Sequence, residues 1–218
     1  MNHFSEIQKT FEIKEGIKIY DFLKCVEVLE ELGKYHFGSQ FKIYDKDLPV
    51  IKKLMIYAIR DEVTAAAMDL NIQKGIILSG PVGCGKTSLM FLMNYFFQQG
   101  YDYKIKPCRD IAFDFAAKGY EVLDAFTKLK GTQVRLNAYC FDDLGTEKQI
   151  KHFGNECNVM AEIILTRYDN FIHNKTITHI TTNLSASEME MFYGDRVRSR
   201  LRQMFNLIAF DKDSPDKR

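Results

Sequence analysis

The chain has 218 residues, of which 46% are hydrophobic and 27% charged, a composition typical of a globular protein with one α/β core and a modest extension. Its formal net charge of +1 excludes a global field that would draw it to nucleic acid or to an anionic membrane, so any DNA contact must come from local patches. No apolar run approaches the roughly 20 residues of a membrane span, and the first residues do not resemble a signal peptide. The five cysteines form no Cys-x-x-Cys pair. We therefore expect reduced thiols, buried except for Cys84, in a cytoplasmic protein without a membrane partner.

Residues 1–72 contain no glycine-rich loop and are predicted to form a helical N-terminal extension. Apolar residues from Ile19 to Leu32 recur at helical spacing, and Gly33 is predicted to end this helix. A second helix is predicted to begin at Asp47, with Pro49 in its first turn, and to continue through residues 61–70. These helices either cover a core or form a docking arm for a partner protein, and the pattern is compatible with both.

Residues 73–218 alternate short apolar runs with helical patterns. Such alternation predicts parallel strands joined by helical crossovers, and hence a three-layer α/β domain with helices on both faces of a parallel sheet. The charged tail after residue 210 is too short to form a helical C-terminal lid domain. The predicted strands are 75–79, 103–108, 138–141, 176–181 and 207–210, and the predicted helices are 86–99, 110–130 with a break near Gly119, and 156–171.

The segment Gly80-Pro-Val-Gly-Cys-Gly-Lys-Thr87 matches G-x-x-x-x-G-K-[ST], the P-loop motif, at every fixed position. It follows a predicted strand and opens a predicted helix, which is the context that this motif requires. Its glycines let successive N–H groups point at phosphate oxygens, and the helix dipole adds to the attraction. Lys86 is expected to reach the β- and γ-phosphates of ATP, and Thr87 to bind Mg²⁺ through its hydroxyl. The predicted nucleotide-binding residues are Gly80, Pro81, Val82, Gly83, Cys84, Gly85, Lys86, Thr87 and Ser88.

A second motif, Tyr139-Cys-Phe-Asp-Asp-Leu-Gly145, is an apolar strand that ends in two carboxylates. Because the carboxyl ends of parallel strands face the ligand crevice, Asp142 is predicted to hold the magnesium shell, and Asp143 to orient or deprotonate the attacking water. The Asp143 side chain is one methylene shorter than a glutamate, which would slow hydrolysis. Glu147, just beyond, is a further acidic candidate for the site, although a surface role is expected for it.

A third strand ends in the small polar residues Thr181-Thr-Asn183. Asn183 is predicted to hydrogen-bond the γ-phosphate or the attacking water, since the expected strand order places it beside Asp142. The alternative is that Asn183 caps the helix that begins near Ser185, a common role for asparagine.

Four arginines occupy alternate positions in Asp195-Arg-Val-Arg-Ser-Arg-Leu-Arg202. On a helix two residues turn by about 200°, so Arg196 and Arg200 share one face, and Arg198 and Arg202 share nearly the opposite face. One pair could enter the ATP site of a neighbouring subunit, where a permanent charge and a planar fork suit phosphate oxygens. The alternative is a solvated basic face with Asp195 as ion-pair partner.

Taken in chain order, these motifs resemble the DnaC/IstB group of AAA+ ATPases, which is related to DnaA and to the helicase loader DnaI. The resemblance lies within residues 74–218 and rests on the P-loop, the acidic strand, the pair Arg167-Tyr168 with the strand to Leu184, and the arginine-rich segment. It implies an ATPase that binds ATP and Mg²⁺ between self-assembled subunits. The trans-acting arginine finger of the group corresponds to Arg200, with Arg196 in support.

The resemblance further implies an ATP-controlled assembly factor on single- or double-stranded DNA, with the replicative helicase as partner in helicase loaders. A terminal arginine that senses nucleotide would correspond to Arg218, although Pro215 and the spacing depart from the pattern. In the group the second strand and the helices that follow it face DNA. Here this region contains Lys104, Lys106, Lys118, Lys128 and Lys130, with Phe113, Phe115 and Tyr120 as candidate stacking residues.

Four functions stay open at this point. The first is a helicase-loader-like ATPase in DNA replication. The second is a transposition helper ATPase with a transposase as partner. The third is a small-molecule phosphotransferase, although the arginine-bearing lid of such kinases is missing from the sequence. The fourth is a nucleotide-gated binding module with little turnover.

Overall fold

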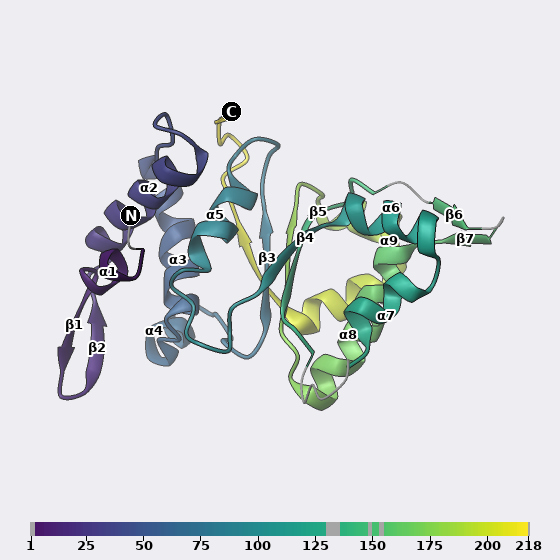
Figure 1. The fold of residues 1–218 in the computed structure, drawn as a ribbon, viewed down its shortest axis with the longest axis horizontal. Coiled ribbons are helices and arrows are strands. Elements are labelled where there is room, and N and C mark those ends of the chain that lie inside the picture. Colours follow the sequence, from purple (N-terminus) through teal and green to yellow (C-terminus); the bar gives the residue numbers. More distant parts are fainter. Residues whose placement is uncertain (1–2, 130–135, 148–149, 153–154, 218) are drawn as a thin grey trace. The chain divides into compact units, whose positions relative to one another are not determined.

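The computed structural model describes residues 3–129, 136–147, 150–152 and 155–217 (Figure 1). The chain divides into two compact units. The first unit comprises Met1–Leu70 with Ser88–Gly100, and the second comprises Asn71–Thr87 with Tyr101–Arg218. Among the described residues, no helix is both long enough and apolar enough to cross a membrane.

The first unit contains a β-hairpin that the sequence analysis did not predict. Strands β1 (Phe11–Lys14) and β2 (Ile17–Tyr20) pair antiparallel, so Ile19 lies in a strand and not in a helix. The turn between them has φ angles of 51° at Glu15 and 80° at Gly16, as a tight two-residue hairpin turn requires. The described helices of this unit before residue 71 are α1 (His3–Gln8), α2 (Phe22–Phe37), the short 3-10 helix η1 (Asp45–Asp47), α3 (Leu48–Ala58) and α4 (Glu62–Ala67).

Helix α2 begins after Asp21, whose carboxylate accepts hydrogen bonds from the N–H groups of Leu23 and Lys24 at 3.0 and 3.3 Å. The prediction that Gly33 ends the helix was wrong, because α2 continues to Phe37 and is followed by Gly38 with a φ angle of 102°. Gly33 instead allows a ring to pack closely on the helix, since a Cβ atom at this position would overlap the side chain of Phe41.

Helix α3 has Pro49 in its first turn, as predicted, but it ends at Ala58. Residues 62–67 form the separate helix α4, whose N-cap is Asp61. The carboxylate of Asp61 accepts a hydrogen bond from the N–H of Thr64 at 3.0 Å, which favours a new helix start over a continuation of α3.

The second unit is built on a five-stranded parallel sheet with the strand order β4-β5-β8-β3-β9, which confirms the predicted α/β fold (Figure 1). The strand that precedes the P-loop therefore lies next to the strand that ends in Thr182. That strand in turn lies next to the acidic one. The five strands are β3 (Gly75–Ser79), β4 (Lys104–Pro107), β5 (Tyr139–Leu144), β8 (Thr178–Thr182) and β9 (Phe205–Ala209).

A second, unpredicted hairpin follows the acidic strand. It consists of β6 (Ile150–His152) and β7 (Asn155–Cys157), which pair antiparallel. The helix that was predicted to begin at residue 156 therefore begins at Val159. Its N-cap is Asn158, whose side-chain oxygen accepts a hydrogen bond from the N–H of Ala161 at 3.1 Å.

One hydrophobic core joins the sheet to four helices of the second unit. It includes Phe115 and Phe141, both of which are fully buried. The predicted break near Gly119 is confirmed, since it separates two of these helices. Helix α5 (Lys86–Met93) ends earlier than predicted. The four core helices are α6 (Cys108–Lys118), α7 (Glu121–Thr127), α8 (Val159–Asn174) and α9 (Ala186–Met204).

The most unusual core residue is Arg167 on α8, whose side chain is fully buried. Its Nε donates to Thr178 Oγ1 at 2.7 Å and its Nη1 to the carbonyl of Phe126 at 2.8 Å. Its Nη2 donates to the carbonyls of Asn137 and Ile177 at 3.1 and 3.0 Å. Burial lowers the pKa of Arg167 to about 10, so the guanidinium stays charged at neutral pH. Arg167 thus ties the loops before β5 and β8 to α8, a role that the sequence analysis had left unassigned.

Replacing Arg167 with methionine should destabilise the protein, because one buried and two partly buried carbonyl groups and a buried hydroxyl would lose their donor. We expect the free energy of unfolding to fall by about 3 kcal/mol or more, measured by urea denaturation. The control is Arg202→Met at an exposed position of α9, where a change within about 0.5 kcal/mol is expected. Equal stability of the two variants would contradict a structural role for Arg167.

Candidate nucleotide-binding site

The P-loop connects β3 to α5 and has the backbone conformation that its glycines permit. The φ angles of Gly83 and Gly85 are 78° and 96°, a region that residues with a Cβ rarely adopt. Gly80 is needed for a different reason, since a Cβ atom there would lie 2.8 Å from Cβ of Phe210. Cys84 is fully buried, so the expectation that its thiol is exposed was wrong.

Lys86 is held inside the loop that precedes it. Its ammonium donates to the carbonyl of Gly80 at 3.0 Å and to that of Pro81 at 2.8 Å, and the residue is only 5% exposed. These bonds compensate for the removal of a charge from water. An ammonium has three N–H groups, so a third remains to donate to a phosphate oxygen.

Thr87, at the start of α5, joins the P-loop to the acidic strand. Its hydroxyl lies 2.8 Å from Oδ1 and 3.1 Å from Oδ2 of Asp142 at the end of β5. Asp142 is 6% exposed. Burial raises the pKa of Asp142, while the hydrogen bonds from Thr181 and Thr87 act in the opposite direction. A hydroxyl and a carboxylate in contact form an oxygen donor set that fits Mg²⁺, which prefers one or two carboxylates and retains several waters.

Thr181 on β8 completes this cluster, and the sequence analysis had not assigned it a role. Its hydroxyl donates to Oδ1 of Asp142 at 2.6 Å and accepts a hydrogen bond from the N–H of Asp143 at 2.9 Å. One side chain therefore fixes both acidic residues. The available signal was the pair of threonines near the end of a buried strand, where an apolar residue would otherwise be expected.

Asp143 follows with a backbone that leaves the regular strand. Its φ angle is 54°, and the pairing of β5 with β8 is irregular between Phe141 and Leu144. Its carbonyl accepts hydrogen bonds from the N–H and the hydroxyl of Thr146 at 3.1 and 2.7 Å. A left-handed aspartate costs about 1 kcal/mol or more and is a typical feature of functional sites. In a regular strand successive side chains point to opposite faces of the sheet. Because of the irregularity between Phe141 and Leu144, the Asp143 side chain does not follow this alternation.

Glu147 differs from the surface residue that the sequence analysis expected. Its Oε2 accepts a hydrogen bond from the N–H of Gly145 at 2.9 Å, and its Oε1 accepts one from the hydroxyl of Tyr193 on α9. Burial raises the pKa of Glu147. Glu147 therefore connects the loop after the acidic strand to the helix that carries the arginines.

Asn183 directly follows β8 and is exposed. The N-cap of α9 is Ser185, whose hydroxyl accepts from the N–H of Glu188 at 3.3 Å. The alternative that Asn183 caps this helix is therefore wrong. The pairing of β8 with β5 places Asn183 one residue beyond Thr182, which pairs with Leu144.

The arginines lie on α9 beyond a kink at Gly194, where the backbone has φ 79° and ψ 164°. Arg196 is exposed, and the guanidinium of Arg200 lies 5.0 Å from the ring centroid of Tyr168 on α8. Arg198 pairs with Glu190, and not with Asp195 as the alternative interpretation had it. Among the described residues, no hydrogen bond or ion pair joins Arg196 or Arg200 to the P-loop. Arg218 lies outside the described residues.

No protein-family model and no curated protein sequence matches the chain. A crystal structure of DnaI has a TM-score of 0.51 and 19% identity, covering 79% of this chain and 89% of that one. The AMPPCP-bound DnaA from Aquifex aeolicus has a TM-score of 0.50 and 16% identity, covering 81% of this chain and 50% of that one. A crystal structure of the DnaC helicase loader has a TM-score of 0.48 and 19% identity, covering 72% of this chain and 91% of that one. The likeness to DnaI and DnaA concerns the fold alone, a parallel sheet flanked by helices with a P-loop after β3.

Replacing Thr181 with valine tests whether its hydroxyl organises the acidic cluster. The change keeps the shape but removes the donor to Asp142 and the acceptor for the N–H of Asp143. We expect the Mg²⁺ concentration for half-maximal ATP binding to rise about tenfold, because a buried hydrogen bond to a charged group contributes about 1.5–3 kcal/mol. Thr181→Ser should behave like the unaltered protein. If Thr181→Val has the Mg²⁺ dependence of Thr181→Ser, the hydroxyl is not needed.

Proposed function

We propose that this chain is an ATP-binding and ATP-hydrolysing AAA+ protein that acts in DNA replication as a helicase-loader-like assembly factor. The main observation in favour of ATP binding is the contact of Thr87 with Asp142. It lies next to a P-loop in which Lys86 is held in place by the carbonyl groups of Gly80 and Pro81. The likeness in fold to DnaI and DnaA is consistent with this proposal. The nucleotide analogue in the DnaA structure belongs to that protein.

In this proposal the P-loop amides and Lys86 bind the phosphates of ATP. Thr87 and Asp142 would hold Mg²⁺, which supplies positive charge to the β- and γ-phosphate oxygens. Asp143 orients or deprotonates the attacking water, and the adjacent N–H–Thr181 hydrogen bond fixes its backbone. Asn183 would contact the γ-phosphate or that water. Ser88, the residue after Thr87 in α5, belongs to the same phosphate-binding segment.

The arginines of α9 would act on the ATP site of a neighbouring subunit. Arg200 is the proposed finger and Arg196 the supporting residue. The contact of Arg200 with the Tyr168 ring holds a permanent charge at the surface of α8 and α9 without an ion-pair partner among the described residues. Arg198 is less suited to this role, because its charge is already paired with Glu190.

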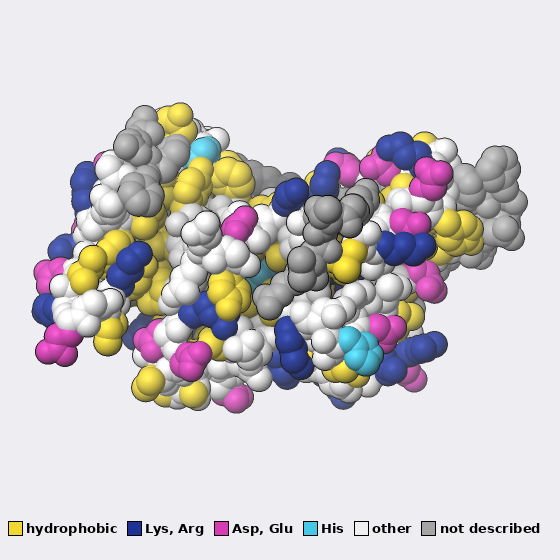
Figure 2. Space-filling view, turned by 60° about the horizontal axis from the view of Figure 1, so that its bottom comes forward, with side chains coloured by type: hydrophobic (Ala, Val, Ile, Leu, Met, Phe, Trp, Pro, Cys, Tyr) yellow, Lys and Arg dark blue, Asp and Glu magenta, His cyan; other side chains and the backbone are white. Residues whose placement is uncertain are grey.

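A DNA contact would have to be local. On the face drawn in Figure 2, basic and acidic side chains of the described residues are interspersed. A cavity of about 450 Å³ beside the edge strand β4 offers one such place. Phe113 and Tyr120 are exposed at 61% and 57% and could stack on bases, whereas Phe115 is in the core. The basic residues that line the cavity are Lys104, Lys106, Lys118 and Lys128, while Lys130 lies outside the described residues.

The partner of the first unit is proposed to be a replicative helicase. The competing partner is a transposase, in which case the same ATPase would serve as a transposition helper. Pull-down of purified replicative helicase and of purified transposase by the chain distinguishes the two. Binding of neither would leave only the nucleotide part of the proposal.

Asp143→Asn should preserve ATP binding and reduce turnover by about 100-fold or more, because the amide cannot accept a proton from water. Steady-state phosphate release at saturating ATP measures this, with the dissociation constant of ATP determined in parallel. The control is Asp169→Asn, an exposed carboxylate on α8, which should change neither quantity. Unaltered turnover in Asp143→Asn would remove this residue from the mechanism.

Steady-state hydrolysis against protein concentration, with and without single-stranded DNA, tests the shared-site proposal. Turnover should rise more steeply than linearly and be stimulated by DNA. Arg200→Ala should lose the concentration-dependent part by about 10³-fold while ATP binding to isolated subunits is retained. Arg202→Ala, two residues further along α9, is the matched control. Linear or absent turnover with ATP still bound would point to the nucleotide-gated binding module instead.

A further inference from the structure

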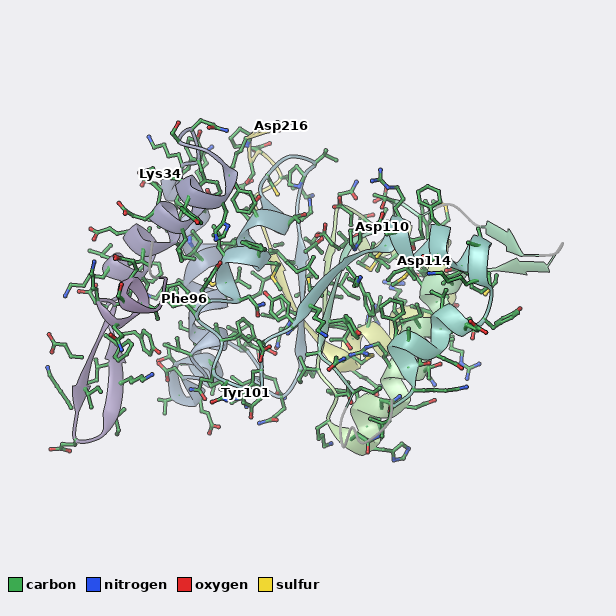
Figure 3. The ribbon with its side chains drawn as sticks, in the orientation of Figure 1. Lys34, Phe96, Tyr101, Asp110, Asp114 and Asp216 are labelled. Atoms are coloured by element: carbon green, nitrogen blue, oxygen red, sulfur yellow. The ribbon has the colours of Figure 1, made fainter. Side chains whose placement is uncertain are left out.

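The segment after β9 does not leave the molecule but returns to the P-loop. The N–H of Phe210 donates to the carbonyl of Ser79 at 2.8 Å, where β3 ends. At the other end of the segment, the N–H of Lys217 donates to the carbonyl of Gly83 at 3.0 Å, and its ammonium donates to the carbonyl of Cys84 at 2.9 Å. We call residues 211–217 the strap; Figure 3 labels Asp216 near its end.

The strap lies close against the loop. A Cβ atom at Gly83 would overlap the carboxylate of Asp216, so glycine at this position is required for the approach as well as for its φ angle. The Lys217 ammonium lies 5.1 Å from the ring centroid of Phe210. Within the strap, the N–H of Ser214 donates to the carbonyl of Asp211 at 3.0 Å, and Ser214 is only 7% exposed. These contacts define a conformation and not a loose terminus.

The direction of these bonds matters. When a P-loop curls so that its N–H groups point inward at phosphate, its carbonyl groups point away from the phosphate. Lys217 binds two of these carbonyl groups, those of Gly83 and Cys84, with its backbone N–H and its ammonium. Lys217 therefore stabilises the curled conformation of the loop from the side of these carbonyl groups, opposite the N–H groups. A loop that is already curled loses less conformational entropy when phosphate binds.

We propose that the strap is a part of the nucleotide site, in which Lys217 increases and Asp216 decreases the affinity for a nucleoside triphosphate. The proposal rests on the nucleotide binding proposed above. Lys217 is a positioning residue that fixes the curl of the loop and adds a positive charge at its rim. Asp216 places a negative charge against Gly83, on the same loop that attracts the phosphates. The two neighbouring residues thus set the affinity by opposing effects.

Equilibrium titration with methylanthraniloyl-ATP and Mg²⁺ tests the two residues separately. Lys217→Gln should weaken binding about tenfold, since it loses a charged hydrogen bond, and Lys217→Arg should restore most of it. Asp216→Asn should tighten binding about threefold in low salt and less in high salt, because Asp216 is exposed and its charge is screened.

The strap itself provides matched controls. Lys212→Gln and Asp213→Asn make the same charge changes at exposed strap positions whose side chains have no contact with the P-loop among the described residues. Both should bind the probe within about twofold of the unaltered protein. If Lys217→Gln and Asp216→Asn match these controls, the proposal is wrong.

A second measurement follows from the reciprocity of coupled binding. In a Ser214→Cys variant that also carries Cys157→Ala, to remove the one partly exposed cysteine, Mg²⁺ and ATP should slow thiol labelling at position 214 at least threefold, about 0.6 kcal/mol. Unchanged labelling at saturating ATP would contradict the proposal.

The variant Lys86→Ala distinguishes a failure of the strap proposal from a failure of the proposed nucleotide binding. If the unaltered protein binds the probe and Lys86→Ala does not, the nucleotide site is established, and the strap variants alone decide the strap. If Lys86→Ala binds the probe as the unaltered protein does, the proposed function fails first.

Discussion

The carboxylate of Asp142 is the point on which the arrangement of the site depends. It is nearly buried, and an acid in that position needs hydrogen-bond donors, because an unsatisfied buried polar group costs about 1–3 kcal/mol. The donors come from the two neighbours in the fold, Thr87 at the start of α5 and Thr181 on β8. Asp142 lies on β5 and Thr181 on β8. At the opposite ends of these two strands, Arg167 donates to the carbonyl groups of Asn137 and Ile177, which precede β5 and β8. The hydrogen bonds of Asp142 and of Arg167 thus hold β5 and β8 together at both of their ends.

Two further sets of hydrogen bonds join the segments around Asp142 and the P-loop to residues that are distant in sequence. Glu147 joins the loop after the acidic strand to Tyr193, one residue before the kink of α9, the helix that carries the arginines. Lys217 joins the end of the chain to the carbonyl side of the P-loop. Both connections act on elements that the proposed function assigns to ATP, the first on the trans-acting arginines and the second on phosphate binding.

The sequence predicted those features whose causes are local. The P-loop, the parallel sheet and the break at Gly119 follow from glycine spacing and from alternating apolar runs. The two hairpins were missed because short strands that lie apart from the main sheet carry little periodicity, and Ile19 happened to continue a helical spacing. Gly33 was misassigned because its reason is a contact with Phe41 and not a helix end. Glu147 and Lys217 depend on partners 46 and 133 residues away, which no local pattern reveals. Thr181 also depends on a distant partner, 38 residues away, but the pair of threonines near the end of a buried strand was a local signal for it.

All the proposed roles of the chain require that it binds ATP through the P-loop with Mg²⁺ at Thr87 and Asp142. Isothermal titration of the full chain with ATP, with and without Mg²⁺, tests it most directly when the unaltered protein is compared with Lys86→Ala. The chain should bind one ATP, more tightly in the presence of Mg²⁺, and Lys86→Ala should lose measurable binding without loss of folded structure. Equal binding by the two proteins, or binding that does not depend on Mg²⁺, would contradict it.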